Sequence, residues 1–165
     1  MLSDAKILAR DIMTTDVAVV LPDSSLLAAL KLMTSRDVSG LPVVDEQGNV
    51  VGMITEGDLL NWHENYSDRE ARRLNLLADG FDLAPDFLKE VQEQRRKIRS
   101  IMSSKPITVT ETTSARDIAS LMHRHGIKRV PVMRDGKLVG IVSRVDLVRA
   151  LLQRLSQVES PPPGP

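Results

Sequence analysis

The sequence predicts an α/β (α+β) protein made of two pseudo-symmetric β-α-β-β-α repeats with a helical insert between them. The main observation is an internal repeat, because Ile12-Met13-Thr14-Thr15 recurs 89 residues later as Ile101-Met102-Ser103-Ser104. The same offset relates Leu32-Met33 to Leu121-Met122 and Pro42-Val43 to Pro131-Val132. One residue is then lost in a turn, and the matches continue with Val51-Gly52 and Val139-Gly140. Chance matches do not stay in register over nearly fifty residues, so the chain is a tandem duplication.

Each copy begins with a short apolar strand, predicted over 17–21 and 107–109, followed by a helix. Asp23 and Thr113 are the predicted N-caps, because their side-chain oxygens can accept hydrogen bonds from the first free amides. Apolar residues at helical spacing define the buried face of each helix. They are Leu26, Ala29, Leu30 and Met33 in the first copy, and Ala115, Ile118, Ala119 and Met122 in the second.

Two further strands and a second helix complete each copy. Gly126 is expected to end the first helix of the second copy in a left-handed conformation. The two strands are joined by residues 45–49 in the first copy and by Asp135-Gly136 in the second, which are rich in turn-forming residues. The last helix begins at a hydroxyl residue, Thr55 or Ser143. The predicted boundaries are 10–60 for the first repeat and 99–156 for the second.

Composition limits the function. The 165-residue chain has 22 basic and 22 acidic residues, so no net charge points to nucleic acid or to an anionic membrane. It contains no cysteine, which excludes disulfides and thiolate metal sites. Its longest apolar runs are far shorter than a membrane span. We expect a cytoplasmic protein with no membrane insertion, no nucleic-acid partner and no metal site.

The insert, residues 61–98, contains all four aromatic residues of the chain: Trp62, Tyr66, Phe81 and Phe87. It is charged and has helical spacing, so one interpretation is a helical connector held by aromatic anchors. The other is a dimer contact or a lid over a site, because aromatic residues concentrate at interfaces. Residues 157–165 form a proline-rich tail that we expect to be extended and disordered.

A short motif opens the last helix of both copies. Thr55-x-x-Asp58 and Ser143-x-x-Asp146 fit a capping box, although aspartate is shorter than the usual glutamate and should reach back less well. They also fit a ligand site. The helix start and its hydroxyl can bind phosphate, and a carboxylate one turn later can accept both hydroxyls of a ribose. The two interpretations are compatible.

The ordered motifs of both copies resemble the cystathionine-β-synthase-type (CBS) domain. The first copy carries Ile-Met-Thr, Ser-Gly-Leu-Pro-Val-Val-Asp and Gly-Met-Ile-Thr-Glu-Gly-Asp-Leu. The second carries Ile-Met-Ser, Ile-Lys-Arg-Val-Pro-Val-Met and Gly-Ile-Val-Ser-Arg-Val-Asp-Leu. The resemblance implies a CBS pair, or Bateman module, with its two copies packed sheet to sheet. Such modules usually dimerise and bind adenosine-containing ligands in clefts between the copies.

The resemblance also implies site residues. Asp58 and Asp146 would bind the ribose. The phosphate end would include Thr55, Ser143, Arg144, Lys128, Arg129 and Ser39. The base would lie against Thr15, Asp16, Val17, Val38, Ile54, Lys105, Pro106, Ile107, Ile127 and Val142, several of which are also natural core residues.

The two copies differ in charge at the phosphate end. The second copy has Lys128, Arg129 and Arg144, where the first has Ser39, Gly40 and Glu56. We therefore expect two unequal sites, with phosphate-rich nucleotides favouring the second copy's cations.

No constellation for covalent or acid–base catalysis is present, so the predicted function is a non-catalytic sensor. It would bind AMP, ADP, ATP or S-adenosylmethionine as a regulatory ligand, with no catalytic cofactor. It would act as a homodimer on a separate effector protein. The alternative is a constitutive scaffold whose clefts stay empty.

Overall fold

The chain folds into two compact units that do not follow the order of the sequence. The structure, a computed structural model, describes residues 6–60, 89, 92 and 95–159. Unit 1 comprises Met1–Val17 and Ile107–Pro165, and unit 2 comprises Ala18–Pro106. Residues 7–17 and 96–106, which contain the start of each repeat, are called here the leading segments. Each unit therefore combines one repeat with the leading segment of the other.

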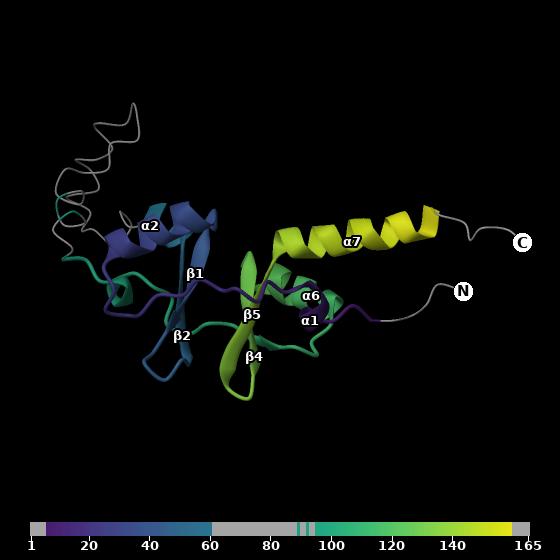
Figure 1. Cartoon of the computed structure of the whole chain (residues 1–165), viewed down its shortest axis with the longest axis horizontal. Helices are drawn as coiled ribbons and strands as arrows, with labels where there is room; N and C mark the ends of the chain where they lie inside the picture. Colours follow the sequence, from purple (N-terminus) through teal and green to yellow (C-terminus); the bar gives the residue numbers. More distant parts are fainter. Residues whose placement is uncertain (1–5, 61–88, 90–91, 93–94, 160–165) are drawn as a thin grey trace, which may run out of the picture. The chain divides into compact units, whose positions relative to one another are not determined.

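Unit 2 is built on an antiparallel hairpin. Strand β1 (Gly40–Val44) pairs with β2 (Val50–Thr55), and helix α2 (Leu26–Arg36) lies beside them and runs across the strand direction (Figure 1). Helix α3 (Glu56–Leu60) continues directly from β2. The core cluster contains Val20, Leu26, Ala29, Met33, Leu41, Val43, Ile54 and Ile98.

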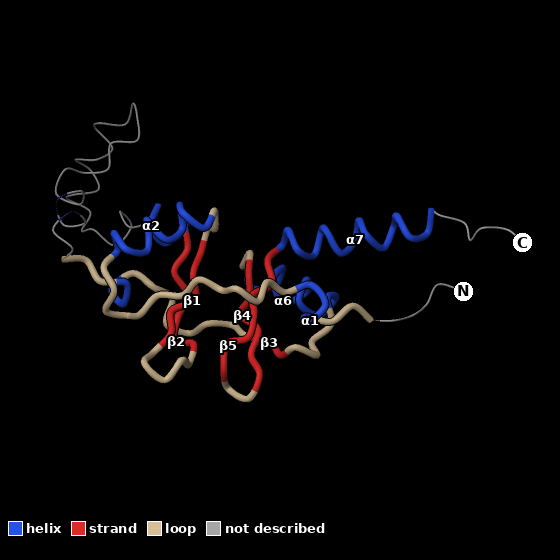
Figure 2. Tube along the Cα trace, in the orientation of Figure 1, coloured by secondary structure: helices blue, strands red, loops and turns tan. Residues whose placement is uncertain are grey.

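Unit 1 contains the corresponding elements of the second repeat and one additional strand. Strand β3 (Val109–Thr110) pairs in parallel with β4 (Arg129–Arg134), which pairs antiparallel with β5 (Lys137–Ser143). Helix α6 (Ala115–His125) lies beside this sheet, and α7 (Arg144–Glu159) extends from β5 as a long single helix (Figure 2). The core cluster contains Ala9, Val109, Ile118, Met122, Val130, Val132 and Val142.

The leading segments complete these cores. Ala9 in helix α1 (Ala9–Ile12) and Ile98 in the 3-10 helix η2 (Ile98–Ser100) are equivalent in the repeat, and both are fully buried. The Ala9 amide donates to the Thr113 carbonyl at 2.8 Å, and the Ile98 amide donates to the Ser24 carbonyl at 3.0 Å. Each repeat thus buries an apolar side chain from the other repeat's leading segment.

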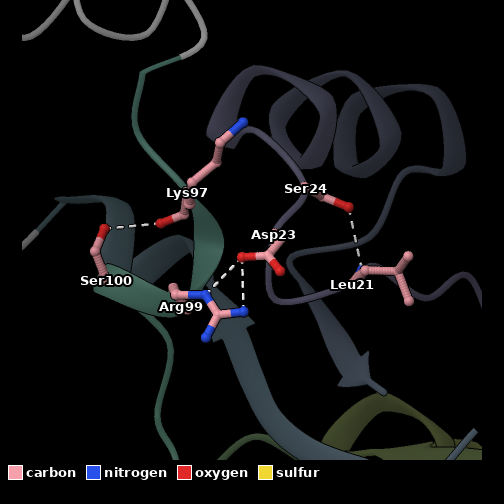
Figure 3. Close-up of polar contacts among 6 residues, drawn as sticks. All are labelled: Leu21, Asp23, Ser24, Lys97, Arg99 and Ser100. Atoms are coloured by element: carbon pink, nitrogen blue, oxygen red, sulfur yellow. Dashed lines mark hydrogen bonds and ion pairs between the residues drawn. The ribbon is translucent and has the colours of Figure 1, made fainter. Parts of the chain in front are cut away.

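An ion pair also ties the second leading segment to unit 2. The Arg99 Nε donates to Asp23 Oδ1 at 2.7 Å, and its Nη2 lies 2.6 Å from the same oxygen (Figure 3). Asp23 is therefore occupied by a residue 76 positions away and does not cap α2. The predicted N-cap was wrong, because Ser25 holds that position and accepts from the Ala28 amide.

The other predicted cap was also wrong. Ser114 caps α6 by accepting from the Asp117 amide at 3.1 Å, whereas Thr113 Oγ1 accepts from the Thr110 amide before the helix. On α6, Ile118 and Met122 are buried as predicted, but Ala119 is exposed, and the partly buried Leu121 packs against the core instead. The helix therefore presents a slightly different face from the predicted one.

The first strand of each copy is shorter than predicted. Over 17–21, only Val20 pairs, in a single parallel bridge with Val43. Over 107–109, the strand starts at Val109 and continues to Thr110. The leading segments bond the residues that follow, Pro22 and Ser24 in unit 2 and Glu111 and Thr113 in unit 1.

The turn predictions are confirmed. Gly126 ends α6 with a φ of 63°, and Asp135-Gly136 joins β4 to β5 with φ values of 48° and 76°. In the longer turn, Asp45 Oδ1 accepts from the amides of Gln47 and Asn49.

The predicted insert lies largely outside the described residues, as do its four aromatics. Within the described part of the chain, no helix is long and apolar enough to cross a membrane.

Substitutions at Ser25 and Asp23 test which of the two residues caps α2. We expect Ser25→Ala to lower the free energy of unfolding by about 1 kcal/mol, because it leaves the Ala28 amide without its acceptor. Asp23→Ala, the matched control, removes only an exposed ion pair and should change it by less than about 0.5 kcal/mol. Urea unfolding measures both, and a larger loss for Asp23→Ala would contradict the assignment.

Candidate functional site

The two motifs that open α3 and α7 have nearly identical geometry. Thr55 and Ser143 are the last residues of β2 and β5, and each helix starts at the next residue. Asp58 Oδ2 accepts from the Thr55 amide at 2.7 Å and from its hydroxyl at 3.0 Å. Asp146 Oδ2 accepts from the Ser143 amide and hydroxyl, both at 2.7 Å. In return, the Asp58 and Asp146 amides donate to these hydroxyls at 3.4 and 3.3 Å.

Both motifs are therefore capping boxes, and the expectation that aspartate reaches back poorly was wrong. One carboxylate oxygen accepts from both the amide and the hydroxyl of the preceding strand residue. The shorter side chain suffices because the amide it must reach lies at the strand end directly before the helix. The capping interpretation of the motif is thus correct for both copies.

The second carboxylate oxygen distinguishes the two copies. In the described part of the chain, Asp58 Oδ1 makes no hydrogen bond within the protein. Asp146 Oδ1 lies 3.6 Å from Nη1 of the exposed Arg149. Both aspartates are half-buried, so each keeps one oxygen that can still accept hydrogen bonds. Sequence reasoning missed Arg149, although its position three residues after Asp146 on a helix is a usable signal.

The predicted phosphate-end residues are held together by the same backbone contact in both copies. The Glu56 amide donates to the Ser39 carbonyl at 3.0 Å, and the Arg144 amide donates to the Lys128 carbonyl at 2.9 Å. In unit 1, Arg144 Nε also donates to the Ile127 carbonyl at 3.2 Å. The backbone therefore brings Arg144 beside Lys128, and Glu56 beside Ser39.

An open groove of about 540 Å³ lies at this end of unit 2. Three of its lining residues, Val38, Ser39 and Glu56, belong to the first copy's predicted site region. The complete lining is Leu30, Met33, Thr34, Asp37, Val38, Ser39, Glu56 and Leu59. The groove is thus formed by the end of α2, the start of β1 and α3.

The residues predicted to line the base divide by burial. Ile54 and Val142 are fully buried and pack in the two core clusters. Val38 is 39% exposed, and Ile127 is half-buried against the unit 1 core. Val38 and Ile127 therefore keep surface available to a ligand, as do the half-buried Val17, Pro106 and Ile107.

The leading segments carry the remaining predicted base residues. Residues 15–17 lie in unit 1 with Asp146, whereas Lys105 and Pro106 lie in unit 2 with Asp58. Ile107 begins the second part of unit 1. Each aspartate thus shares its unit with the leading segment of the other repeat.

Metal-ligating side chains do not gather within the described residues, where no group of three His, Asp or Glu could hold an ion. His123 and His125 are exposed on α6, and His63 lies outside the described residues.

Comparison with known proteins identifies the family. The model of the CBS domain matches residues 9–65 and 98–153, which together make up most of the chain. The chain therefore belongs to the CBS domain family, and both the predicted family and the predicted fold class are confirmed.

Individual relatives agree with this assignment. CBSX2, a chloroplastic CBS domain-containing protein of Arabidopsis thaliana, is 34% identical over 148 residues. That match covers 86% of this chain and 61% of the relative, so the chain spans about three fifths of its length. Protein MJ1426 of Methanocaldococcus jannaschii is 32% identical over 158 residues, covering 88% of this chain and 91% of the relative.

Two solved structures resemble the chain and contain adenosyl ligands. CBSX2 in complex with AMP is similar with a TM-score of 0.66 and 31% identity, covering 89% of this chain and 97% of that one. The CBS domain pair of MJ0100, in complex with 5′-methylthioadenosine and S-adenosyl-L-methionine, has a TM-score of 0.64 and 25% identity. It covers 91% of this chain and 99% of that one. These related CBS pairs thus bind adenosine-containing molecules.

Proposed function

We propose that this chain is a non-catalytic regulatory module that binds an adenosine-containing ligand, with Asp58 and Asp146 as the ribose acceptors. The proposal rests on one observation, that the two oxygens of each carboxylate are bonded differently. Oδ2 caps the helix, which fixes the side chain, while Oδ1 is available to accept hydroxyl protons. A fixed carboxylate binds a diol without losing further side-chain entropy, and such charge-assisted hydrogen bonds are the strong ones.

The phosphate would be bound mainly by cations at the opening of α7. Ser143 has a single hydroxyl proton, and it is donated to Asp146. It could reach a phosphate only by leaving that bond, as Thr55 could in the first copy. Arg144, Lys128 and Arg129 place three positive charges at this end of unit 1. Phosphate binding should therefore be stronger in unit 1, whereas Glu56 opposes it in unit 2.

The regulatory readout would pass through the proposed homodimer or through a separate effector protein. Ligand binding can shift such contacts only by as much as its affinity differs between two states. AMP, ADP, ATP and S-adenosylmethionine are the candidate ligands, and no catalytic cofactor is proposed. The rival proposal, a scaffold that binds no ligand, makes the opposite prediction for every titration below.

Asparagine variants test the ribose role apart from the cap. Asp58→Asn and Asp146→Asn can keep the amide-to-oxygen cap but lose the charge and one acceptor. We expect each to weaken AMP binding at its own unit by about tenfold or more, since a hydrogen bond to a charged group contributes about 1.5–3 kcal/mol. Isothermal titration calorimetry measures this.

A thermal-shift assay supplies the complementary measurement. Wild type at AMP concentrations about a hundred times the dissociation constant should gain about 2.7 kcal/mol of stability. Absence of any shift with AMP, ADP, ATP and S-adenosylmethionine would favour the scaffold. Unchanged AMP affinity in both asparagine variants would contradict the ribose assignment.

Exchanging the charges between copies tests the asymmetry. Arg144→Glu gives the second copy the residue of the first, and Glu56→Arg does the reverse. We expect Arg144→Glu to weaken AMP binding by about tenfold and Glu56→Arg to strengthen it, because charges near the phosphate interact by about 1 kcal/mol or more. Adenosine, which has no phosphate, is the matched control ligand and should change by less than about twofold. Equal effects on AMP and adenosine would show that the charges do not face a phosphate.

Helix α7 offers the surface for the proposed homodimer. Five apolar side chains on it are between 56% and 64% exposed: Val145, Val148, Leu151, Leu152 and Leu155. Residues 145, 148, 152 and 155 follow the alternating spacing of three and four that allows two helices to pack along a seam. Their exposed apolar area is on the order of 500 Å², and doubling it across a twofold axis reaches the lower range of stable interfaces.

A charge placed in this stripe should separate the dimer. We expect Leu152→Glu to weaken self-association by at least about tenfold, because it would bury an unpaired carboxylate. Gln153→Glu, at the neighbouring exposed position of α7, is the control and should leave association unchanged. Sedimentation velocity measures both, and a dimer that persists in Leu152→Glu would place its interface elsewhere.

A further inference from the structure

Two glycines occupy equivalent places in the two units, each covered by a methionine of the other repeat. A Cβ added to Gly140 would lie 2.5 Å from Met13 Sδ and 2.8 Å from its Cγ. A Cβ added to Gly52 would lie 2.8 Å from Met102 Sδ and 2.7 Å from the Ser103 carbonyl oxygen. Real Cβ contacts are not this short, so Gly140 must be glycine while Met13 is in place. Gly52 must be glycine because of both Met102 and the Ser103 carbonyl.

The strand geometry beside each glycine is the same. The pairing of β1 with β2 shifts between Val43 and Val44, opposite the residue just before Gly52. The pairing of β4 with β5 shifts between Val132 and Met133, opposite Val139, the residue just before Gly140. Such a bulge bends the strand locally and exposes its face to an approaching chain. The methionine therefore packs at a site built into the hairpin of each unit.

Main-chain hydrogen bonds secure the leading segment next to each methionine. The Thr14 amide donates to the Ile141 carbonyl at 2.9 Å, and the Ile141 amide donates back at 3.0 Å. The Met53 amide donates to the Ser103 carbonyl at 3.0 Å, and the Ser103 amide donates back at 2.9 Å. Each pair is an isolated bridge of two bonds.

An isolated bridge defines register weakly, because slipping by one residue moves the segment by only about 3.3 Å. The methionine side chain seated over glycine adds a steric reason for one register. A methionine suits this position because its unbranched side chain fills irregular gaps. The bridge and the side chain together select one placement.

The register matters because the predicted base-lining residues follow at once. Thr15 is the residue after the bridged Thr14, and Lys105 comes two residues after the bridged Ser103. A one-residue slip would turn each of these side chains to the opposite face of the segment. It would therefore move the base-lining residues relative to the aspartate in the same unit.

We propose that Met13 and Met102 are positioning residues for the two ligand sites. Each packs over a glycine of the other repeat and sets the register of its base-lining segment: Met13 on Gly140 for the site with Asp146, and Met102 on Gly52 for the site with Asp58. The inference has two halves. The ligand half, that the two methionines position the base-lining residues for a ligand, rests on the proposed function. The register half, that they set the register of their segments, concerns the protein alone.

A double-mutant cycle in unit 1 tests the contact itself. We expect Gly140→Ala to displace Met13 and to raise hydrogen exchange at the Thr14 and Ile141 amides by about tenfold or more. The Met53 and Ser103 amides in unit 2 are the internal control and should stay within about twofold. Met13→Ala should raise exchange at the same two amides. Met13→Ala/Gly140→Ala should lie closer to wild type than Gly140→Ala does, because the new methyl group occupies space that the methionine has left.

The same variants are then titrated with AMP in an Asp58→Asn background, which leaves the unit 1 site as the binding site. We expect Gly140→Ala to weaken AMP by about tenfold, with partial recovery in the double variant. If the contact only stabilised the fold, Gly140→Ala would lower the free energy of unfolding without selectively weakening AMP binding in unit 1. If Gly140→Ala does not fold, Met13→Ala and its counterpart Met102→Ala, read at the Met53 and Ser103 amides, test the same contact.

The outcomes separate the two halves. Unchanged exchange at Thr14 and Ile141 in both single variants, or a double variant no closer to wild type than Gly140→Ala, would overturn the register half. Raised exchange with unaltered AMP affinity would overturn the positioning role. A wild-type chain that binds no adenosyl ligand would overturn the proposed function and the ligand half with it, while the exchange data would still decide the register half.

Discussion

The exchange of leading segments is the interaction on which the rest of the structure depends. Ala9 and Ile98 are fully buried in the core clusters of the units formed by the other repeat. Neither repeat completes its core with its own leading segment. The chain therefore passes between units after Val17 and again after Pro106, and each unit depends on residues distant in sequence. This explains why the duplication is kept in register: a shift in either copy would alter the partner's core as well as its own.

The two interpretations of the Thr/Ser-x-x-Asp motif describe different atoms of one side chain. Capping uses Oδ2 and the hydroxyl, and it requires no ligand. A ligand would use Oδ1, which the cap leaves in place at a half-buried position. The cap therefore does not compete with the proposed ribose contact and instead orients it. Competition arises only at the hydroxyl, whose one proton cannot serve the aspartate and a phosphate together.

Sequence patterns predicted the repeat, the element order and both motif positions because these depend on local spacing and on identity between the copies. They could not predict the segment exchange, since an offset of 89 residues is satisfied equally whether a segment packs on its own repeat or on the other. The N-caps failed because Asp23, Ser25, Thr113 and Ser114 are all good capping residues, so residue type alone does not choose between neighbours. Ser25 and Ser114, which cap α2 and α6, are equivalent in the repeat. Burial of Ile54 and Val142 was decided by tertiary packing.

The two copies share a backbone geometry at the helix openings and differ there in the charge of their side chains. The amide at the first position of α3 or α7 donates to a carbonyl at the equivalent strand start, at 3.0 Å in one unit and 2.9 Å in the other. On this common geometry, Glu56 and Ser39 in one copy correspond to Arg144 and Lys128 in the other. Moving a charge from negative to positive at a fixed backbone position changes electrostatic preference without changing shape. The two proposed sites would therefore share one architecture and differ in ligand preference, with the more cationic one, proposed in unit 1, favouring ligands that carry phosphate.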